Sequence, residues 1–140
     1  MPLLGIRVIN AQLVAKGLQD LKSEVPRIGK DRIENTGKRI VKQMQKYPPQ
    51  RAGSRYTRTY QFKNSWVITL QARGISIRNT ARGKSGLYGD YVVGDERGDG
   101  QAWMHVGNWL LFRDVVDYEM TKLPDDVENH IRLYAHGKGL

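Results

Sequence analysis

The sequence of 140 residues contains no cysteine. Disulfide bonds, thiolate metal sites and a cysteine nucleophile are therefore excluded. Long hydrophobic runs are also missing, since the longest unbroken apolar stretch lies at 109–112 and a membrane-spanning helix needs ~20 residues. The first ten residues show neither the basic nor the apolar region of a signal peptide. These absences predict a soluble protein that is made in a reducing cytoplasm and binds no membrane.

Known catalytic and cofactor motifs are absent as well. The three histidines, His105, His130 and His136, do not have the spacing of a zinc site, and no acidic metal-binding loop is present. The segment GKSG at 83–86 lacks the upstream glycine of a phosphate-binding loop, because position 78 is arginine. No serine lies in a nucleophile-elbow sequence. We therefore predict a protein that is not an enzyme and holds neither a metal nor a cofactor.

Charge is plentiful but unevenly distributed along the chain. Residues 1–86 carry 18 Lys/Arg against 4 Asp/Glu, a balance of +14, and residues 87–140 carry 5 against 10, a balance of −5, which together give the net charge of +9. The basic part could face the phosphates of nucleic acid. Alternatively, the two oppositely charged parts could join copies of the chain or neighbouring proteins. A solvated basic surface without a partner is the third interpretation.

Apolar residues at helical spacing predict a helix near the N-terminus. The stripe begins with Val14, Leu18, Leu21, Val25 and Ile28 and continues to Met44, with lysines and arginines on the opposite face. Pro26 and Gly29 interrupt it, which allows either one kinked helix or two helices that meet near 26–30.

A second amphipathic helix is predicted near the C-terminus, where Pro124 is expected to begin a second helical segment and Gly137 to end it. Acidic residues, Glu119 among them, lie opposite the apolar stripe and are predicted to form a solvated face. The stripe consists of Phe112, Val116, Met120, Leu123, Val127, Ile131 and Tyr134.

Between these helices, 67–73 and 75–80 alternate apolar and polar residues around Gly74 and predict a β-hairpin. Residues 6–9 (I-R-V-I) predict a further short strand, and 88–94 leaves strand and short helix open. The prediction is one α+β domain over residues 1–140, a small antiparallel sheet flanked by N-terminal and C-terminal amphipathic helices. Its loops lie near 47–59, 81–87 and 95–108.

Two features predict contacts with other molecules. The first loop interleaves arginine and tyrosine, which can stack bases and bind phosphates, anchor a protein interface, or simply lie exposed. Trp66 and Trp109 are expected in the core, whereas Trp103 is flanked by turn residues and is the candidate interface anchor. The predicted interface or DNA-facing residues are Arg51, Arg55, Tyr56, Arg58 and Trp103.

The order of these features resembles the head–tail joining proteins of tailed bacteriophages, a family of neck, tail-completion and minor tail proteins also described as virion morphogenesis proteins. The basic N-terminal helix runs to K-Y-P-P at 46–49. The stretch 59–65 (T-Y-Q-F-K-N-S) is similar to the family's T-G-x-L-x-x-S, and 88–94 (Y-G-D-Y-V-V-G) is similar to its Y-A-x-Y-V-E-x-G. The resemblance covers roughly residues 10–135.

The resemblance implies a virion protein, present in the host cytoplasm during assembly, that forms a homo-oligomeric ring between the capsid connector and the tail. Its implied partners are copies of itself and the phage connector and tail proteins, with non-specific contact to DNA in the lumen left open. The residues also leave an alternative function open, a nucleic-acid-binding module that uses the basic N-terminal helix and the Arg/Tyr loop.

Overall fold

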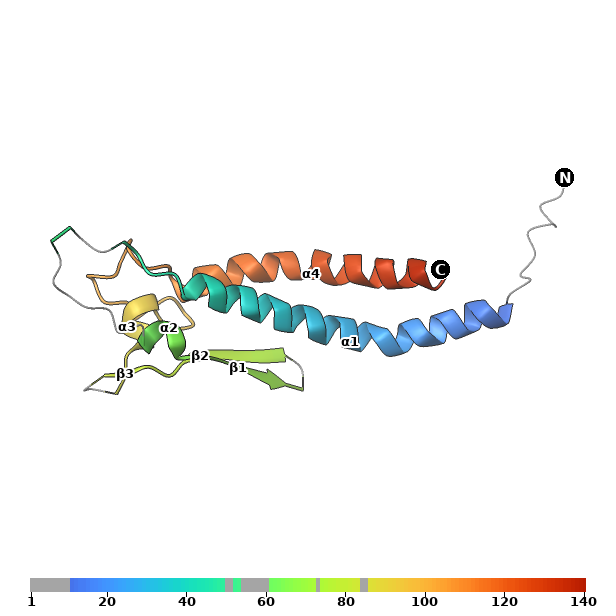
Figure 1. Cartoon of the computed structure of the whole chain (residues 1–140), viewed down its shortest axis with the longest axis horizontal. Helices are drawn as coiled ribbons and strands as arrows, with labels where there is room; N and C mark the ends of the chain where they lie inside the picture. The colour runs from blue at the N-terminus through green and yellow to red at the C-terminus, as the bar shows by residue number, and fades with distance from the viewer. Residues whose placement is uncertain (1–10, 50–51, 54–60, 73, 84–85) are drawn as a thin grey trace. The chain divides into compact units, whose positions relative to one another are not determined.

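The structure, a computed structural model, describes residues 11–49, 52–53, 61–72, 74–83 and 86–140 (Figure 1). The predicted strand at 6–9 lies outside these residues. The helices and small antiparallel sheets form the predicted α+β fold. In chain order the elements are α1 (Ala11–Met44), α2 (Gln61–Asn64), β1 (Trp66–Gln71), β2 (Gly74–Asn79), β3 (Arg82–Gly83), β4 (Gly86–Leu87), α3 (Gly89–Val93) and α4 (Phe112–Gly137).

The chain divides into two compact units. The first contains Met1–Arg32 and Pro124–Leu140, and the second contains Ile33–Leu123. Helix α1 begins in the first unit and ends in the second, whereas α4 begins in the second and ends in the first. The organisation of the chain as one domain stays a prediction.

In the first unit, the two helical segments lie side by side and antiparallel. Near one end of the pair, Nζ of Lys138 lies 3.4 Å from Oδ2 of Asp20. Near the other end, Arg32 lies 3.1 Å from the ring nitrogen Nε2 of His130 and 3.7 Å from Oδ1 of Asp126. The apolar stripe predicted for the N-terminal helix is only partly covered within this unit. The exposed apolar side chains are Val14, Leu18, Val25 and Leu133.

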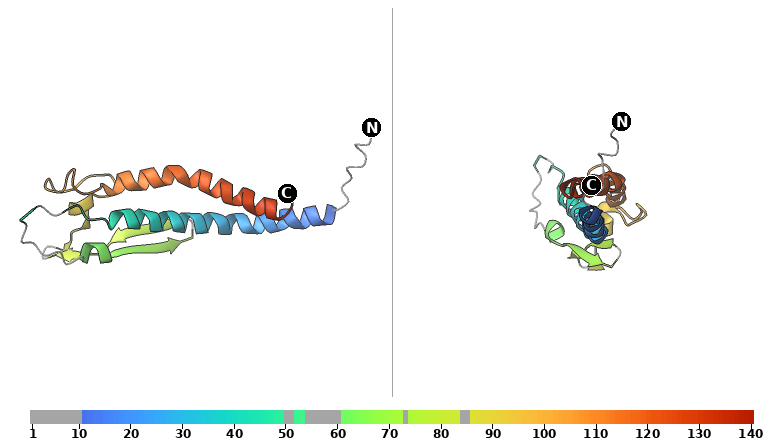
Figure 2. Two further views of the ribbon diagram at one scale, coloured as in Figure 1. Left: turned by 45° about the horizontal axis from the view of Figure 1, so that its top comes forward. Right: turned by 90° about the vertical axis from the view of Figure 1, so that its right-hand side faces the viewer.

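The second unit contains the predicted hairpin, which packs on α1. β1 and β2 pair antiparallel, with Trp66 opposite Asn79 at the open end of the hairpin. Ile75 and Ile77 reach α1 at Gly37, where any side chain on the helix would collide with Ile75. Gly37 therefore allows the strand to approach the helix closely. Figure 2 shows this part of α1 between the hairpin and the first part of α4.

An aromatic cluster centred on Phe62 forms the core of the second unit. The centroid of the Phe62 ring lies 5.5 Å from that of Trp66 and 5.4 Å from that of Trp109, both in edge-on geometry. Tyr47 packs edge-on against Trp109 at 4.8 Å. Trp66 and Trp109 thus pack in the core, as the sequence predicts. The aliphatic side chains around these rings are Ile40, Met44, Val92, Val93 and Val115.

Of the predicted loops, 81–87 contains the two-residue strands β3 and β4, which pair with Arg82 opposite Leu87. The predicted loop at 95–108 consists of turns and irregular chain without helix or strand. The predicted loop at 47–59 lies mostly outside the described residues.

Two prolines lie inside the long helices. Helix α1 continues through Pro26, so of the two alternatives for the N-terminal stripe the single helix is correct. Helix α4 continues through Pro124, so the prediction that a second helical segment begins at this proline is wrong. A proline leaves the carbonyl four residues earlier without its N–H partner. Those carbonyls belong to Lys22 and Met120, which are exposed residues, so water can hydrate them. Gly137 ends α4 as predicted.

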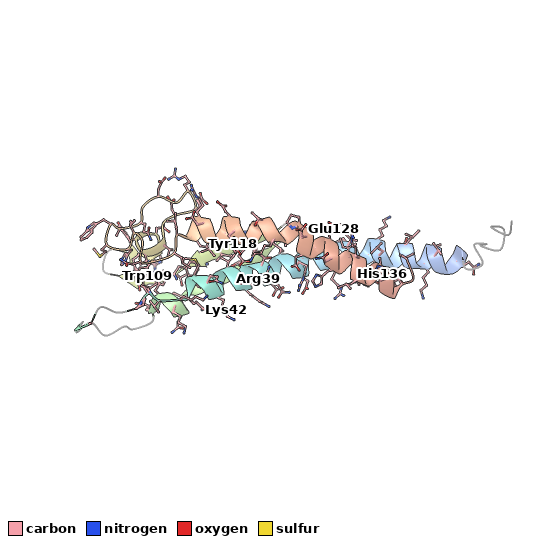
Figure 3. All side chains as sticks on the ribbon, turned by 90° about the horizontal axis from the view of Figure 1, so that it is seen from above. Arg39, Lys42, Trp109, Tyr118, Glu128 and His136 are labelled. Atoms are coloured by element: carbon pink, nitrogen blue, oxygen red, sulfur yellow. The ribbon has the colours of Figure 1, made fainter. Side chains whose placement is uncertain are left out.

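The buried face of α4 agrees with the predicted stripe in part, since Phe112 and Val116 pack on the core of the second unit. Val115 and Glu119 are buried, whereas Met120, a member of the predicted stripe, is 42% exposed. The prediction that Glu119 belongs to a solvated face is wrong, because Nε of Arg39 on α1 (labelled in Figure 3) lies 3.1 Å from its carboxylate. Nζ of Lys122 adds a second positive charge at 3.8 Å. These partners offset the cost of removing the carboxylate from water.

The segment 88–94 forms the short helix α3, whose Val92 and Val93 are buried. Gly94 follows the helix with a φ of +77°, a conformation that glycine adopts at little cost. A Cβ atom at this position would lie only 2.7 Å from Cδ1 of Leu111. The backbone conformation and the packing therefore both favour glycine at position 94.

Two alanine variants compare a glycine with close neighbours and a glycine in open space. Gly100 has a similar φ of +81° but open space around it. Gly100→Ala should lower the free energy of unfolding by about 1 kcal/mol, the cost of the left-handed conformation. Gly94→Ala should lower it by about 2 kcal/mol or more, because Gly94 combines a φ of +77° with a ψ of 164°, a region that almost only glycine adopts, and because its Cβ atom would press on Leu111. Denaturant titration measures both values, and equal losses would contradict the stronger requirement for glycine at position 94.

Candidate protein interface

The structure describes one of the five residues predicted to form an interface. Arg51, Arg55, Tyr56 and Arg58 lie outside the described residues. Trp103 is 84% exposed, more than any other large hydrophobic residue in the described part of the chain. The candidate site is therefore built around Trp103.

Trp103 lies between α3 and α4 in a run of turns, residues 101–109, that the side chain of Gln101 holds in place. Nε2 of Gln101 donates a hydrogen bond to the carbonyl oxygen of Val92 at 2.9 Å and to that of Trp109 at 3.3 Å. One side chain thus joins both ends of the run to α3. A segment without regular secondary structure gains a defined geometry in this way, since its backbone carbonyls have internal partners.

Three exposed apolar side chains of this segment form what we call the Trp103 surface. They are Trp103, Met104, which is 55% exposed, and Val106, which is 61% exposed. Trp109 follows six residues after Trp103 and packs edge-on against Phe62 instead. Exposed tryptophan and methionine are typical of protein interfaces, and a group of exposed apolar residues marks an interaction site.

Acidic residues precede the Trp103 surface in the chain. From Asp90 to Asp99 there are four acidic residues and one basic residue, a balance of −3. Oδ1 of Asp95 accepts hydrogen bonds from the backbone N–H of Asp99 at 2.9 Å and of Arg97 at 2.8 Å. The hydrogen bond from Asp99, followed by that from Arg97, lowers the pKa of Asp95 below its ordinary value. The Asp95 carboxylate is therefore held in its ionised form in the turn that precedes the Trp103 surface in the chain.

His105 lies in the same run of turns as Trp103 and contacts the core through Trp109. Its ring stands at right angles to that of Trp109, with the centroids 6.2 Å apart. Burial lowers the pKa of His105 below its ordinary value of 6.5, because the charged imidazolium loses solvation there.

The lowered pKa of His105 predicts a loss of stability in mild acid. As the pH falls below 6.5, the unfolded chain binds a proton at this position before the folded chain does, so the free energy of unfolding decreases. Denaturant titration at pH 7.5 and pH 5.5, of the wild type and of His105→Gln, tests this. The wild type should lose more stability than the variant, which lacks the imidazole at position 105. The same loss in both proteins would contradict the prediction.

Within the described residues, no group of three or more histidine, aspartate or glutamate side chains could hold a metal ion. None of the helices in that part of the chain is long and apolar enough to cross a membrane. Comparisons with protein-family models, with curated proteins and with solved structures find no match to this chain. The functional argument therefore depends on the residues of this chain alone.

Sequence reasoning identified Trp103 but missed Met104 and Val106. The available signal was a run of apolar residues between Gly100 and Gly107 that follows neither the helical nor the strand period. Apolar residues in a turn-rich segment are either buried under the fold or exposed on its surface. The structure shows that Trp103, Met104 and Val106 are exposed.

Proposed function

We propose that this chain is a structural component of a tailed-phage virion at the head–tail interface, of the neck, tail-completion or tail-terminator type. It assembles as a ring, joins the capsid connector to the tail and catalyses no reaction. The observation that carries the proposal is the Trp103 surface, where exposed apolar side chains are held in a defined geometry on an ordered unit. Such preorganised side chains lower the entropic cost of binding.

The uneven charge of the chain supports assembly into a ring. In a ring, each subunit presents one surface to the next copy and a different surface to the previous copy. A basic portion and an acidic portion in the same chain supply complementary potentials, which steer association and fix register. Arg51, Arg55, Tyr56 and Arg58 belong to the proposed interface together with Trp103.

Trp103→Ser tests the proposed contact with a neighbouring virion protein. The stability of the isolated chain should change by less than about 0.5 kcal/mol, because the side chain is exposed. Removing a tryptophan that is buried in an interface typically costs ~2 kcal/mol or more of binding free energy. The yield of joined particles should therefore fall at least tenfold when the variant replaces the wild type in the phage that encodes it.

The control for this experiment is Leu87→Ser, which changes an apolar side chain that is 56% exposed on β4. Particle yield with this control should stay near that of the wild type. Normal yield with Trp103→Ser would contradict a role of the Trp103 surface in joining heads to tails.

The rival function, a nucleic-acid-binding module, makes a different prediction. Its affinity for duplex DNA should fall steeply with salt, with a logarithmic slope of about −0.9 for each neutralised phosphate. Tight salt-dependent binding by the purified chain, together with its absence from virions, would favour the rival.

A further inference from the structure

Positive charge is concentrated in one stretch of the second unit. Residues 35–89 carry 12 Lys/Arg and no Asp/Glu, whereas the rest of that unit carries 3 Lys/Arg and 8 Asp/Glu, so the second unit has a balance of +7. The first unit, with 8 Lys/Arg and 6 Asp/Glu, has a balance of only +2. The stretch 35–89 therefore supplies no carboxylate for its own cations.

Three elements of this stretch are joined by hydrogen bonds near the end of α1. Nε2 of Gln45, which directly follows the helix, donates to the carbonyl oxygen of Lys63 in α2 at 3.0 Å. The hydroxyl group of Tyr47 accepts a hydrogen bond from the backbone N–H of Lys63 at 3.1 Å. At the start of α2, Nε2 of Gln61 donates to the carbonyl oxygen of Arg82 in β3 at 3.3 Å. The end of α1, α2 and β3 are thus held together in one unit.

Four exposed cations at this junction form what we call the basic surface. They are Lys42 (labelled in Figure 3), Lys46, Lys63 and Arg82. Within the described residues, none of the four forms an ion pair with a carboxylate. One turn earlier on α1, Lys38 and Arg39 each have such a partner. The basic surface therefore presents charges that the described part of the chain leaves unbalanced.

Contact between copies of the chain does not balance this charge. Each copy brings the same net charge of +9, so an assembly accumulates positive charge in any arrangement. A net charge far from zero opposes a compact state through self-repulsion. A partner that removes this repulsion needs a large negative charge of its own.

The residue types of the basic surface fit phosphates better than a protein partner. Protein interfaces are depleted in lysine and contain an apolar centre. Three of the four residues here are lysines, and no exposed large hydrophobic residue of the described chain lies in α2 or in α1 beyond Val25. Lysine and arginine supply the contacts to nucleic-acid phosphates without apolar neighbours.

We propose that the basic surface binds the phosphate backbone of duplex DNA without reading its sequence. The site lies at the end of α1, in α2 and in β3, and leaves out the first part of α1. Arg27 and Arg32 in that first part form ion pairs with the acidic residues Glu24 and Asp31. The source of the DNA rests on the proposed function, because a protein between capsid connector and tail lies on the path of the packaged genome, whereas the binding itself does not.

Fluorescence anisotropy with a labelled DNA duplex tests the proposal on the purified full-length chain at a series of salt concentrations. Contacts from all four residues predict a logarithmic salt slope of about −3.6 or steeper, since each neutralised phosphate contributes about −0.9. The triple variant Lys42→Gln/Lys46→Gln/Lys63→Gln should bind at least tenfold more weakly at about 0.1 M salt, with the slope reduced by about 2.7. A duplex of unrelated sequence should bind equally well.

The matched control is Lys16→Gln/Lys22→Gln/Lys30→Gln, which removes the same charge from exposed positions in the first part of α1. This variant should keep most of the affinity and nearly the full salt slope. The same loss in both triple variants would show that binding follows the total charge and would overturn the basic surface as the site.

Three further outcomes would overturn the proposal. The first is a wild-type chain that does not bind the duplex even at low salt. The second is polyglutamate that binds as tightly as the duplex, which would indicate a surface for acidic proteins. The third is a Lys42/Lys46/Lys63 variant that binds DNA normally but loses self-association in analytical ultracentrifugation, which would assign the surface to a second copy. All these results are separate from the proposed function, which is tested on virus particles.

Discussion

Phe62→Ala is expected to lower the free energy of unfolding by about 3–5 kcal/mol, the usual cost of removing a buried aromatic ring. Phe62 is 4% exposed, and its ring contacts those of Trp66 and Trp109 edge-on. Alanine would leave a cavity among these rings, which are held by several elements and cannot move together to fill it. Chemical denaturation, followed by tryptophan fluorescence, measures the effect.

The matched control is Tyr118→Ala, because Tyr118 is an aromatic residue that is 61% exposed. It should cost about 1 kcal/mol or less, the contribution of its contact with Lys122. If Phe62→Ala does not fold, Phe62→Leu retains most of the volume and should cost about 1–2 kcal/mol. A Phe62→Ala protein as stable as Tyr118→Ala would show that the core is not centred on Phe62.

Arg39→Met is expected to be the second most damaging change. It removes the hydrogen bond to Glu119 and leaves that carboxylate 4% exposed. Breaking a fully buried ion pair costs about 3–5 kcal/mol, but the Arg39 side chain is 41% exposed and Lys122 remains 3.8 Å from Glu119. The expected loss in the free energy of unfolding is therefore about 2–3 kcal/mol.

A double variant shows whether the loss comes from the unpaired carboxylate. Arg39→Met combined with Glu119→Leu removes both charges and should recover most of the stability. Asp117→Ala, which changes an exposed carboxylate on the same helix, should cost less than about 0.5 kcal/mol. Equal losses for Arg39→Met and Asp117→Ala would contradict the role of the Arg39–Glu119 pair.

The sequence alone predicted correctly the elements that are marked by alternating apolar residues or by a glycine at the end of a helix. The two alternating runs around Gly74 gave the hairpin, and Gly137 marked the end of the last helix. Both results depend on neighbouring residues, where side-chain period and glycine conformation act directly.

Features that depend on contacts between residues far apart in the chain could not be predicted from local sequence patterns. Glu119 has the position of a surface residue on its helix and is buried because Arg39, 80 residues earlier in the chain, supplies the compensating charge. Pro124 is a helix-breaking signal by itself, but tertiary packing on both sides maintains the helix. The same holds for the candidate site. The flanking turn residues made Trp103 a candidate interface anchor, but the hydrogen bonds of Gln101 that hold its segment join positions with no recognisable sequence pattern.

The measurement that tests the account most directly is electron microscopy of lysates from the encoding phage with a nonsense mutation in the gene for this chain. The account predicts DNA-filled heads and separate tails, with joined particles restored when the wild-type chain is supplied from a plasmid. Mass spectrometry of wild-type virions should then detect the chain in the purified particles. Joined, infectious particles that form without the chain would contradict the proposed role at the head–tail interface.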